Sequence, residues 1–126
     1  MNQIISYIFS IIILLFSIII IININKTNNL EINKIKIQEE INILKEKING
    51  YCIDPFNINT FQIKHNLNTE IYSKNFKICA NNSNYIFCEK VNCETENRNI
   101  FKKENLDFKY NCNITKNQKI KIICTN

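Results

Sequence analysis

The chain has 126 residues, a formal net charge of +5 and a single glycine. Ile, Asn and Lys occur 29, 24 and 15 times, more than half of the chain together, which indicates a very AT-rich genome. The length allows one domain plus an accessory segment. One glycine excludes the Walker-type and dinucleotide-binding loops, which need clustered glycines. One His and no Trp further narrow the acid–base and metal chemistry that the chain can carry.

Residues 4–24 form an almost unbroken apolar stretch in which 16 side chains are Ile, Leu or Phe and none is charged. It is long enough to span a bilayer. At about 0.4 kcal/mol each, the apolar side chains contribute roughly 6 kcal/mol towards insertion. A cleaved signal peptide would need a basic n-region, a shorter apolar stretch and a small-residue cleavage site. We therefore expect an uncleaved, transmembrane signal-anchor helix over residues 1–25, in preference to a cleaved leader or a buried soluble helix.

Residues 26–50 are charged and carry an apolar seam at helical spacing. The seam consists of Ile37, Ile41, Leu44 and Ile48. This pattern predicts an amphipathic stalk helix, with an Lys36–Glu40 pair and a stop at Asn49 and Gly50. In one interpretation, the seam pairs with a partner helix in a short coiled coil. In the other, it packs on the protein's own head domain, because it is shorter than the three to four heptads of a confident coiled coil.

All cysteines lie in the region after Gly50, which we expect to form a separate head domain over residues 51–126. They are Cys52, Cys79, Cys88, Cys93, Cys112 and Cys124. An even number beyond a membrane anchor indicates a disulfide framework whose pairing the sequence leaves open. Three bridges at about 2 to 4 kcal/mol each would match the whole stability of a small domain. Zinc is disfavoured because no Cys-x-x-Cys occurs and only one histidine is present.

Short alternating patterns in the head domain predict half-buried strands at residues 61–63, 76–78, 108–114 and 119–122. Asn and Ser at 81–84 favour a β-hairpin turn. Residues 92–103 are charged and weakly periodic, which favours a loop or a short helix. The fold class that follows is α+β, with an N-terminal transmembrane helix and helical stalk before a small, disulfide-rich, mainly β head.

No motif for catalysis is present, so we expect neither an enzyme nor a cofactor, metal, small-molecule substrate or nucleic-acid site. Four acidic residues could in principle pair as acid and base, but a solvated, charged loop explains them: Glu94, Glu96, Glu104 and Asp107. His65 is interpreted as an ordinary polar loop histidine, with a pH sensor as the alternative. The excess of basic residues in the head domain would suit anionic lipid or glycan surfaces, although codon bias explains it as well.

The topology cues conflict. The cysteines and three sequons indicate an oxidising, lumenal head; the sequons begin at Asn25, Asn81 and Asn113. The basic residues, in contrast, follow the apolar stretch, and the positive-inside rule then favours a cytosolic C-terminal side. A disulfide-bonded domain that faces the cytosol is normally a contradiction. It becomes consistent in a virus that carries its own cytoplasmic thiol-oxidising system.

An N-terminal anchor, a short helical stalk and a small Cys-rich head resemble the small single-span components of the poxvirus entry-fusion complex. Locally, residues 51–56 (YCIDPF) and 87–90 (FCEK) are similar to two short motifs of one component. The composition would suit an insect-infecting poxvirus. The resemblance implies a late, non-enzymatic virion membrane protein that assembles with other small anchored subunits for membrane fusion and viral entry into the host cell. Its head would lie on the outer face of the virion membrane, after passage through host membranes before assembly.

Two other classes remain open. One is another enveloped-virus surface factor, such as an oral infectivity component whose head matures in the secretory pathway. The other is a cellular membrane-anchored, disulfide-rich binding or adhesion module. Occupied sequons would favour both of these over the poxvirus interpretation.

Overall fold

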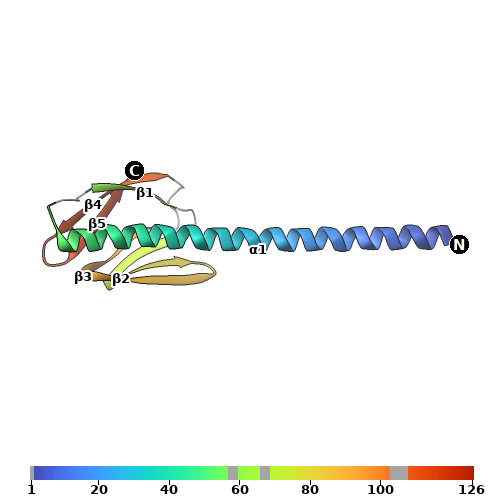
Figure 1. The fold of residues 1–126 in the computed structure, drawn as a ribbon, viewed down its shortest axis with the longest axis horizontal. Coiled ribbons are helices and arrows are strands. Elements are labelled where there is room, and N and C mark those ends of the chain that lie inside the picture. Colours follow the sequence, from blue (N-terminus) through green and yellow to red (C-terminus); the bar gives the residue numbers. More distant parts are fainter. Residues whose placement is uncertain (1, 57–59, 66–68, 103–107) are drawn as a thin grey trace. The chain divides into compact units, whose positions relative to one another are not determined.

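The computed structural model describes residues 2–56, 60–65, 69–102 and 108–126. It contains one helix and five strands: α1 Asn2–Ile53, β1 Thr60–Lys64, β2 Glu70–Asn82, β3 Tyr85–Phe101, β4 Lys109–Lys116 and β5 Ile120–Thr125 (Figure 1). With two disulfides within the strands and a third between α1 and β3, the expected α+β, disulfide-rich architecture is confirmed.

The chain divides into two compact units, Met1–Ile35 and Lys36–Asn126, which we call the span unit and the head unit. The head unit begins within the expected stalk, so the last part of α1 belongs to it. The expected boundaries at residues 25 and 50 stay predictions. The expected helix stop at Asn49 and Gly50 is wrong, because α1 continues to Ile53. Gly50 does not adopt a left-handed conformation, and its carbonyl accepts a hydrogen bond from the Asp54 amide at 3.0 Å.

The strands form one mixed sheet in the order β1-β4-β5-β3-β2. Neighbours are antiparallel except β3 and β5, which run parallel where Thr95 pairs with Ile120. Each of the four expected strands is present. The expected hairpin is also confirmed, because β2 and β3 pair on either side of a turn at Ser83 and Asn84. The loop or helix expected over residues 92–103 is wrong: β3 continues to Phe101, and Lys103 lies outside the described residues.

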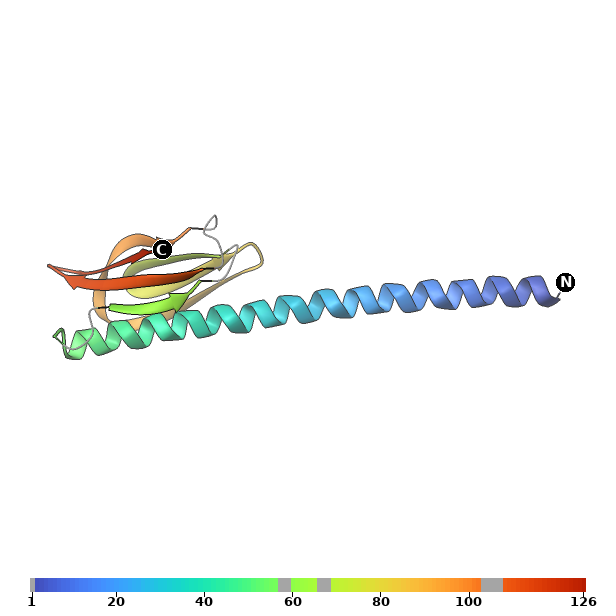
Figure 2. The same cartoon turned by 90° about the horizontal axis from the view of Figure 1, so that it is seen from above.

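The head unit has two layers. In Figure 2, all five strands lie on one side of the last part of α1, and in Figure 1 β1, β4 and β5 appear above the helix with β2 and β3 below it. The core lies between these layers. The helix contributes the seam and Tyr51, and the strands contribute alternate side chains: Phe61, Ile63, Ile71, Ile78, Ala80, Val91, Ile100, Phe101, Tyr110, Cys112, Ile114, Ile120 and Ile122.

The opposite face of the sheet is exposed to solvent, which explains the alternation along β1 and β4. One-sided burial of this kind is typical of sheets with antiparallel pairing. Positions that point away from α1 therefore form the surface of the head unit, and any site on this face is built from the polar half of each strand.

Candidate functional site

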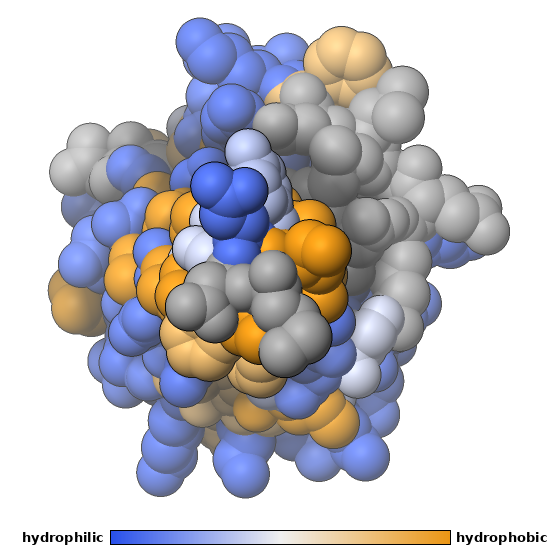
Figure 3. Space-filling model, turned by 90° about the vertical axis from the view of Figure 1, so that its right-hand side faces the viewer, coloured by the Kyte–Doolittle hydropathy of each residue, from blue (hydrophilic) through white to orange (hydrophobic). Residues whose placement is uncertain are grey.

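The span unit presents its apolar side chains to the surroundings. Its helix is long and apolar enough to cross a membrane, with a window of mean hydropathy 3.0 of which 0% is buried. In Figure 3, orange apolar side chains gather on the helix that faces the viewer. Exposure on this scale is unusual for a soluble surface. A membrane anchor would bury these side chains in lipid.

The seam is not a free surface. Ile37, Ile41, Leu44 and Ile48 are at most 1% exposed and belong to the core of the head unit. The structure agrees with the second interpretation of the seam, in which the helix packs on the protein's own head. The interpretation of the seam as a partner surface is therefore wrong. These side chains lie against the sheet, where a second helix has no access.

All six cysteines are paired, which the sequence predicted without the connectivity. The pairs are Cys52–Cys93, Cys79–Cys88 and Cys112–Cys124, and no cysteine is free. The first joins the end of α1 to β3. The second and third each join two directly paired strands, β2 to β3 and β4 to β5. The first bridge thus ties the two layers of the head unit together, the other two reinforce the sheet, and none of the six cysteines is left as a thiol for redox chemistry.

A buried hydrogen-bonded pair, Glu40 and His65, lies between α1 and the residue that follows β1. Nδ1 of His65 is 2.7 Å from Oε1 of Glu40, and the two side chains are 0% and 2% exposed. The imidazole stacks on Phe101 with ring centroids 4.3 Å apart, and Tyr110 meets it edge-on. Among the residues that the structure describes, Nε2 of His65 is buried and has no hydrogen-bond partner. Because solvent does not reach the pair, we assign it a structural role in joining the helix to the sheet layer.

The expectation of an ordinary polar loop histidine is therefore wrong. His65 does follow a strand, but its side chain lies in the core. A signal was present in the sequence: Glu40 lies beside Ile41 and four residues before Leu44, on the apolar face of the helix. A carboxylate at such a position needs a buried partner, and the only histidine of the chain was the natural candidate.

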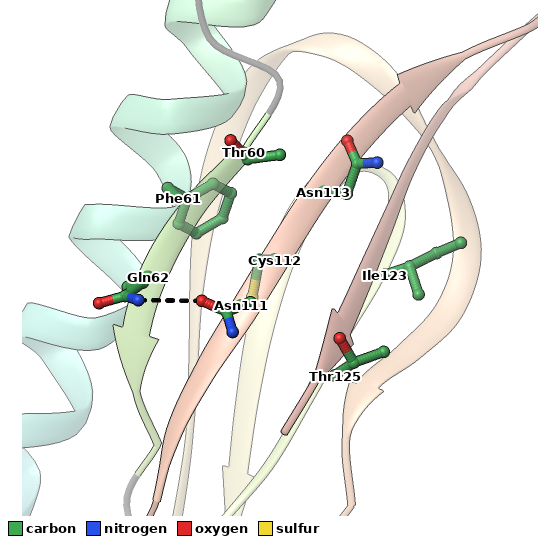
Figure 4. Close-up of a pocket in the computed structure, with 8 residues that line it drawn as sticks. All are labelled: Thr60, Phe61, Gln62, Asn111, Cys112, Asn113, Ile123 and Thr125. Carbon is green, nitrogen blue, oxygen red and sulfur yellow. Dashed lines mark hydrogen bonds between the residues drawn. The ribbon is translucent and has the colours of Figure 1, made fainter.

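A shallow cavity of about 520 Å³ lies on β1, β4 and β5 (Figure 4). Uncharged residues line it: Thr60, Phe61, Gln62, Asn111, Cys112, Asn113, Ile123 and Thr125. Across it, Nε2 of Gln62 donates to Oδ1 of Asn111 at 3.0 Å. Cys112 is bonded to Cys124. The cavity offers hydrogen bonds to a neutral ligand but no group for acid–base or nucleophilic chemistry.

The sequon asparagines differ in exposure. Asn25 and Asn113 are exposed, and Asn81 is half-buried opposite Ile86 in the hairpin. Their use stays a prediction. Within the described ranges, no three His, Cys, Asp or Glu side chains form a group that could hold a metal ion.

Comparison with protein-family models, curated proteins and solved structures gives no match. The likeness to a viral entry component therefore rests on the layout and the two short motifs alone, and it is developed below as a proposal.

Proposed function

We propose that this chain is a non-enzymatic, single-span subunit of a viral entry and membrane-fusion complex. The observation that carries the proposal is that one helix begins as an apolar stretch and ends as the core helix of a disulfide-bonded head. This layout resembles the small anchored components of the poxvirus complex, as do residues 51–56 and 87–90. The head would lie on the outer face of the virion membrane.

A partner subunit would need an exposed apolar surface on this chain. The seam is buried, so a partner subunit would bind the apolar span or other apolar side chains on the head unit. Ile53 and Phe56 are 82% and 96% exposed at the end of α1. The Phe56 amide donates to Oδ1 of Asp54 at 3.2 Å, which orders the turn that presents the ring. Exposed aromatic and aliphatic side chains on an ordered support are typical anchors of protein interfaces.

The anchor is tested first. Extraction with alkaline carbonate should leave the protein in the membrane pellet, and its N-terminus should be intact. An N-terminus near Lys26 would show cleavage and refute the retained anchor.

The entry role is tested by repressing the gene in the virus. Particles should form and attach but fail to fuse, because attachment would use other proteins. Detergent extracts of virions should yield the tagged protein together with other small anchored subunits. An infectious deletion mutant would refute the entry role, and N-glycans at Asn81 or Asn113 would favour the two secretory-pathway alternatives.

The interface is tested by replacing Ile53 and Phe56 with Ser. Partner recovery and fusion should fall while abundance and disulfide content stay normal, because neither side chain packs in the core. Ile43→Ser is the matched control, since Ile43 is an exposed aliphatic residue elsewhere on the same helix, at 42% exposure. Unchanged partner recovery in the Ile53 and Phe56 variant would exclude this surface.

A further inference from the structure

Two lysines face each other on the solvent side of the β2–β3 hairpin. Lys77 pairs directly with Lys90 across the two antiparallel strands, and both are exposed. The hairpin is the yellow and gold ribbon in Figure 1. Side chains at directly opposite positions have Cβ atoms about 4.5 to 5.5 Å apart, where like charges destabilise the sheet. The arrangement thus has an energetic cost that a bound anion would remove.

The neighbouring acidic side chains are engaged elsewhere. Glu89 points to the other face of the hairpin, where it contacts Lys45 of α1 at 2.6 Å. Glu94 lies further along the solvent side of β3 and pairs with Lys119 at 2.7 Å. In the part of the chain that the structure describes, neither lysine of the pair has an acidic partner within 4.0 Å. The positive charge of the hairpin is available to a ligand.

The lysine pair has a rigid, partly apolar support. The Cys79–Cys88 disulfide joins the same two strands two residues away. Beyond it, on the same face, Ile86 is 65% exposed. On the opposite face, the hairpin is held to the helix by the Lys45–Glu89 pair. The hairpin therefore carries two lysines and one exposed aliphatic side chain on the same face, a combination that suits the charged and apolar layers of a lipid surface.

We propose that Lys77, Lys90 and Ile86 form a contact site for anionic lipid headgroups of the bilayer that carries the protein's own anchor. The proposal rests on the membrane anchor but not on the viral role. Only residues 25–35 separate the apolar stretch from the head unit. A tether this short keeps the head at a high effective concentration near the lipid. A bilayer is thus the one anionic surface that the chain itself brings close to the hairpin.

The test uses the full chain in nanodiscs of phosphatidylcholine, with or without phosphatidylserine. Acetylation by a soluble reagent, read by mass spectrometry, reports the accessibility of each lysine. Lys77 and Lys90 should be protected in the anionic discs and released at high salt, which screens exposed charges. Each lysine near an anionic surface contributes about fivefold to the contact equilibrium, so a Lys77→Gln, Lys90→Gln variant should weaken it about 25-fold. The readout for the variant is hydrogen exchange of the amides around Ile86.

Lys109→Gln is the matched control, because Lys109 is an exposed strand lysine at the start of β4. It should leave the protection of the hairpin unchanged. Acetylation of Lys77 and Lys90 to the same extent in both kinds of disc would overturn the proposal. Protection of Lys109 to the same extent as Lys77 and Lys90 would also overturn it, because it would indicate that the basic head as a whole is attracted to anionic lipid. A sulfated oligosaccharide added to neutral discs could protect Lys77 and Lys90 where phosphatidylserine does not. That result would assign the site to a glycan and overturn the proposal of a lipid contact. If the viral entry role is refuted but Lys77 and Lys90 are still protected by anionic lipid, the proposal of the contact site is unaffected.

Discussion

The Glu40–His65 pair allows a sharp test of what holds α1 to the sheet. Removing one partner of a buried hydrogen bond leaves the other polar group without that partner, at a typical cost of about 1 to 3 kcal/mol and more where that group is charged. Both side chains are at most 2% exposed here, so solvent screening provides little relief. Glu40→Met and His65→Leu keep approximate volume and remove one group each. Since a small domain is stable by only about 5 to 15 kcal/mol, either single change should consume a large fraction of the stability.

The double variant should behave differently. With both polar side chains replaced by apolar ones of similar size, neither leaves the other without its partner, and such paired replacements are often close to neutral. We therefore expect the double variant to be less destabilised than the sum of the singles, by at least about 2 kcal/mol. Urea unfolding of the detergent-solubilised chain, followed by tyrosine fluorescence, gives the midpoints. Glu39→Gln, an exposed carboxylate one residue away, should change stability by less than about 0.5 kcal/mol.

Additive single effects, or single variants that each cost under about 1 kcal/mol, would refute this reasoning. Either result would mean that the two groups do not depend on each other in the folded head. A changed slope of the urea transition would indicate an altered unfolded state and would make the comparison invalid.

Three further predictions concern the core, the disulfides and the hairpin. Ile41→Ala should cost about 2 to 5 kcal/mol because the side chain is fully buried, whereas Ile43→Ala should cost under about 1 kcal/mol; urea midpoints compare them. Replacing the Cys52–Cys93 pair by Ser should cost about 1.3 kcal/mol more than replacing Cys79–Cys88, because their sequence separations are 41 and 9; equal midpoints would contradict this loop-entropy argument. Burial raises the pKa of the Tyr85 hydroxyl, so the folded state keeps that proton longer than the unfolded chain and stability is lost as pH rises above about 10. Tyr85→Phe should reduce that alkaline loss, and an unchanged pH profile would contradict the assignment.

Local patterns in the sequence were sufficient for much of the architecture. The apolar stretch over residues 4–24 specified a helix fit for a membrane, because this property depends on composition and length alone. Period-two alternation located four strands, since one face of each is buried and the other solvated. The confinement of all cysteines to one region predicted a disulfide framework, because a thin core needs covalent support.

Tertiary contacts decided the rest. The seam had the same spacing whether it met a second helix or its own sheet, and only the fold placed Ile37 and Ile41 in the head's core. Asn49 and Gly50 favoured a helix end locally, yet α1 continues through them to Cys52, which is bonded to β3. Residues 92–101 had no clear period because β3 pairs with β2 through register shifts and meets β5 beside it.

The pairing of Glu40 with His65 shows the same limit most clearly. Twenty-five positions of chain separate the two residues; the place of Glu40 on the apolar face of the helix called for a buried partner, but local pattern did not show that His65 would reach it. Their contact exists because the helix and the strand β1 pack around a common core, which brings a carboxylate and an imidazole together where water is excluded. Sequence alone determined which segments are apolar, extended or cross-linked. The tertiary structure determined which surfaces remain exposed, because burial depends on what packs against each side chain and local pattern does not contain that information.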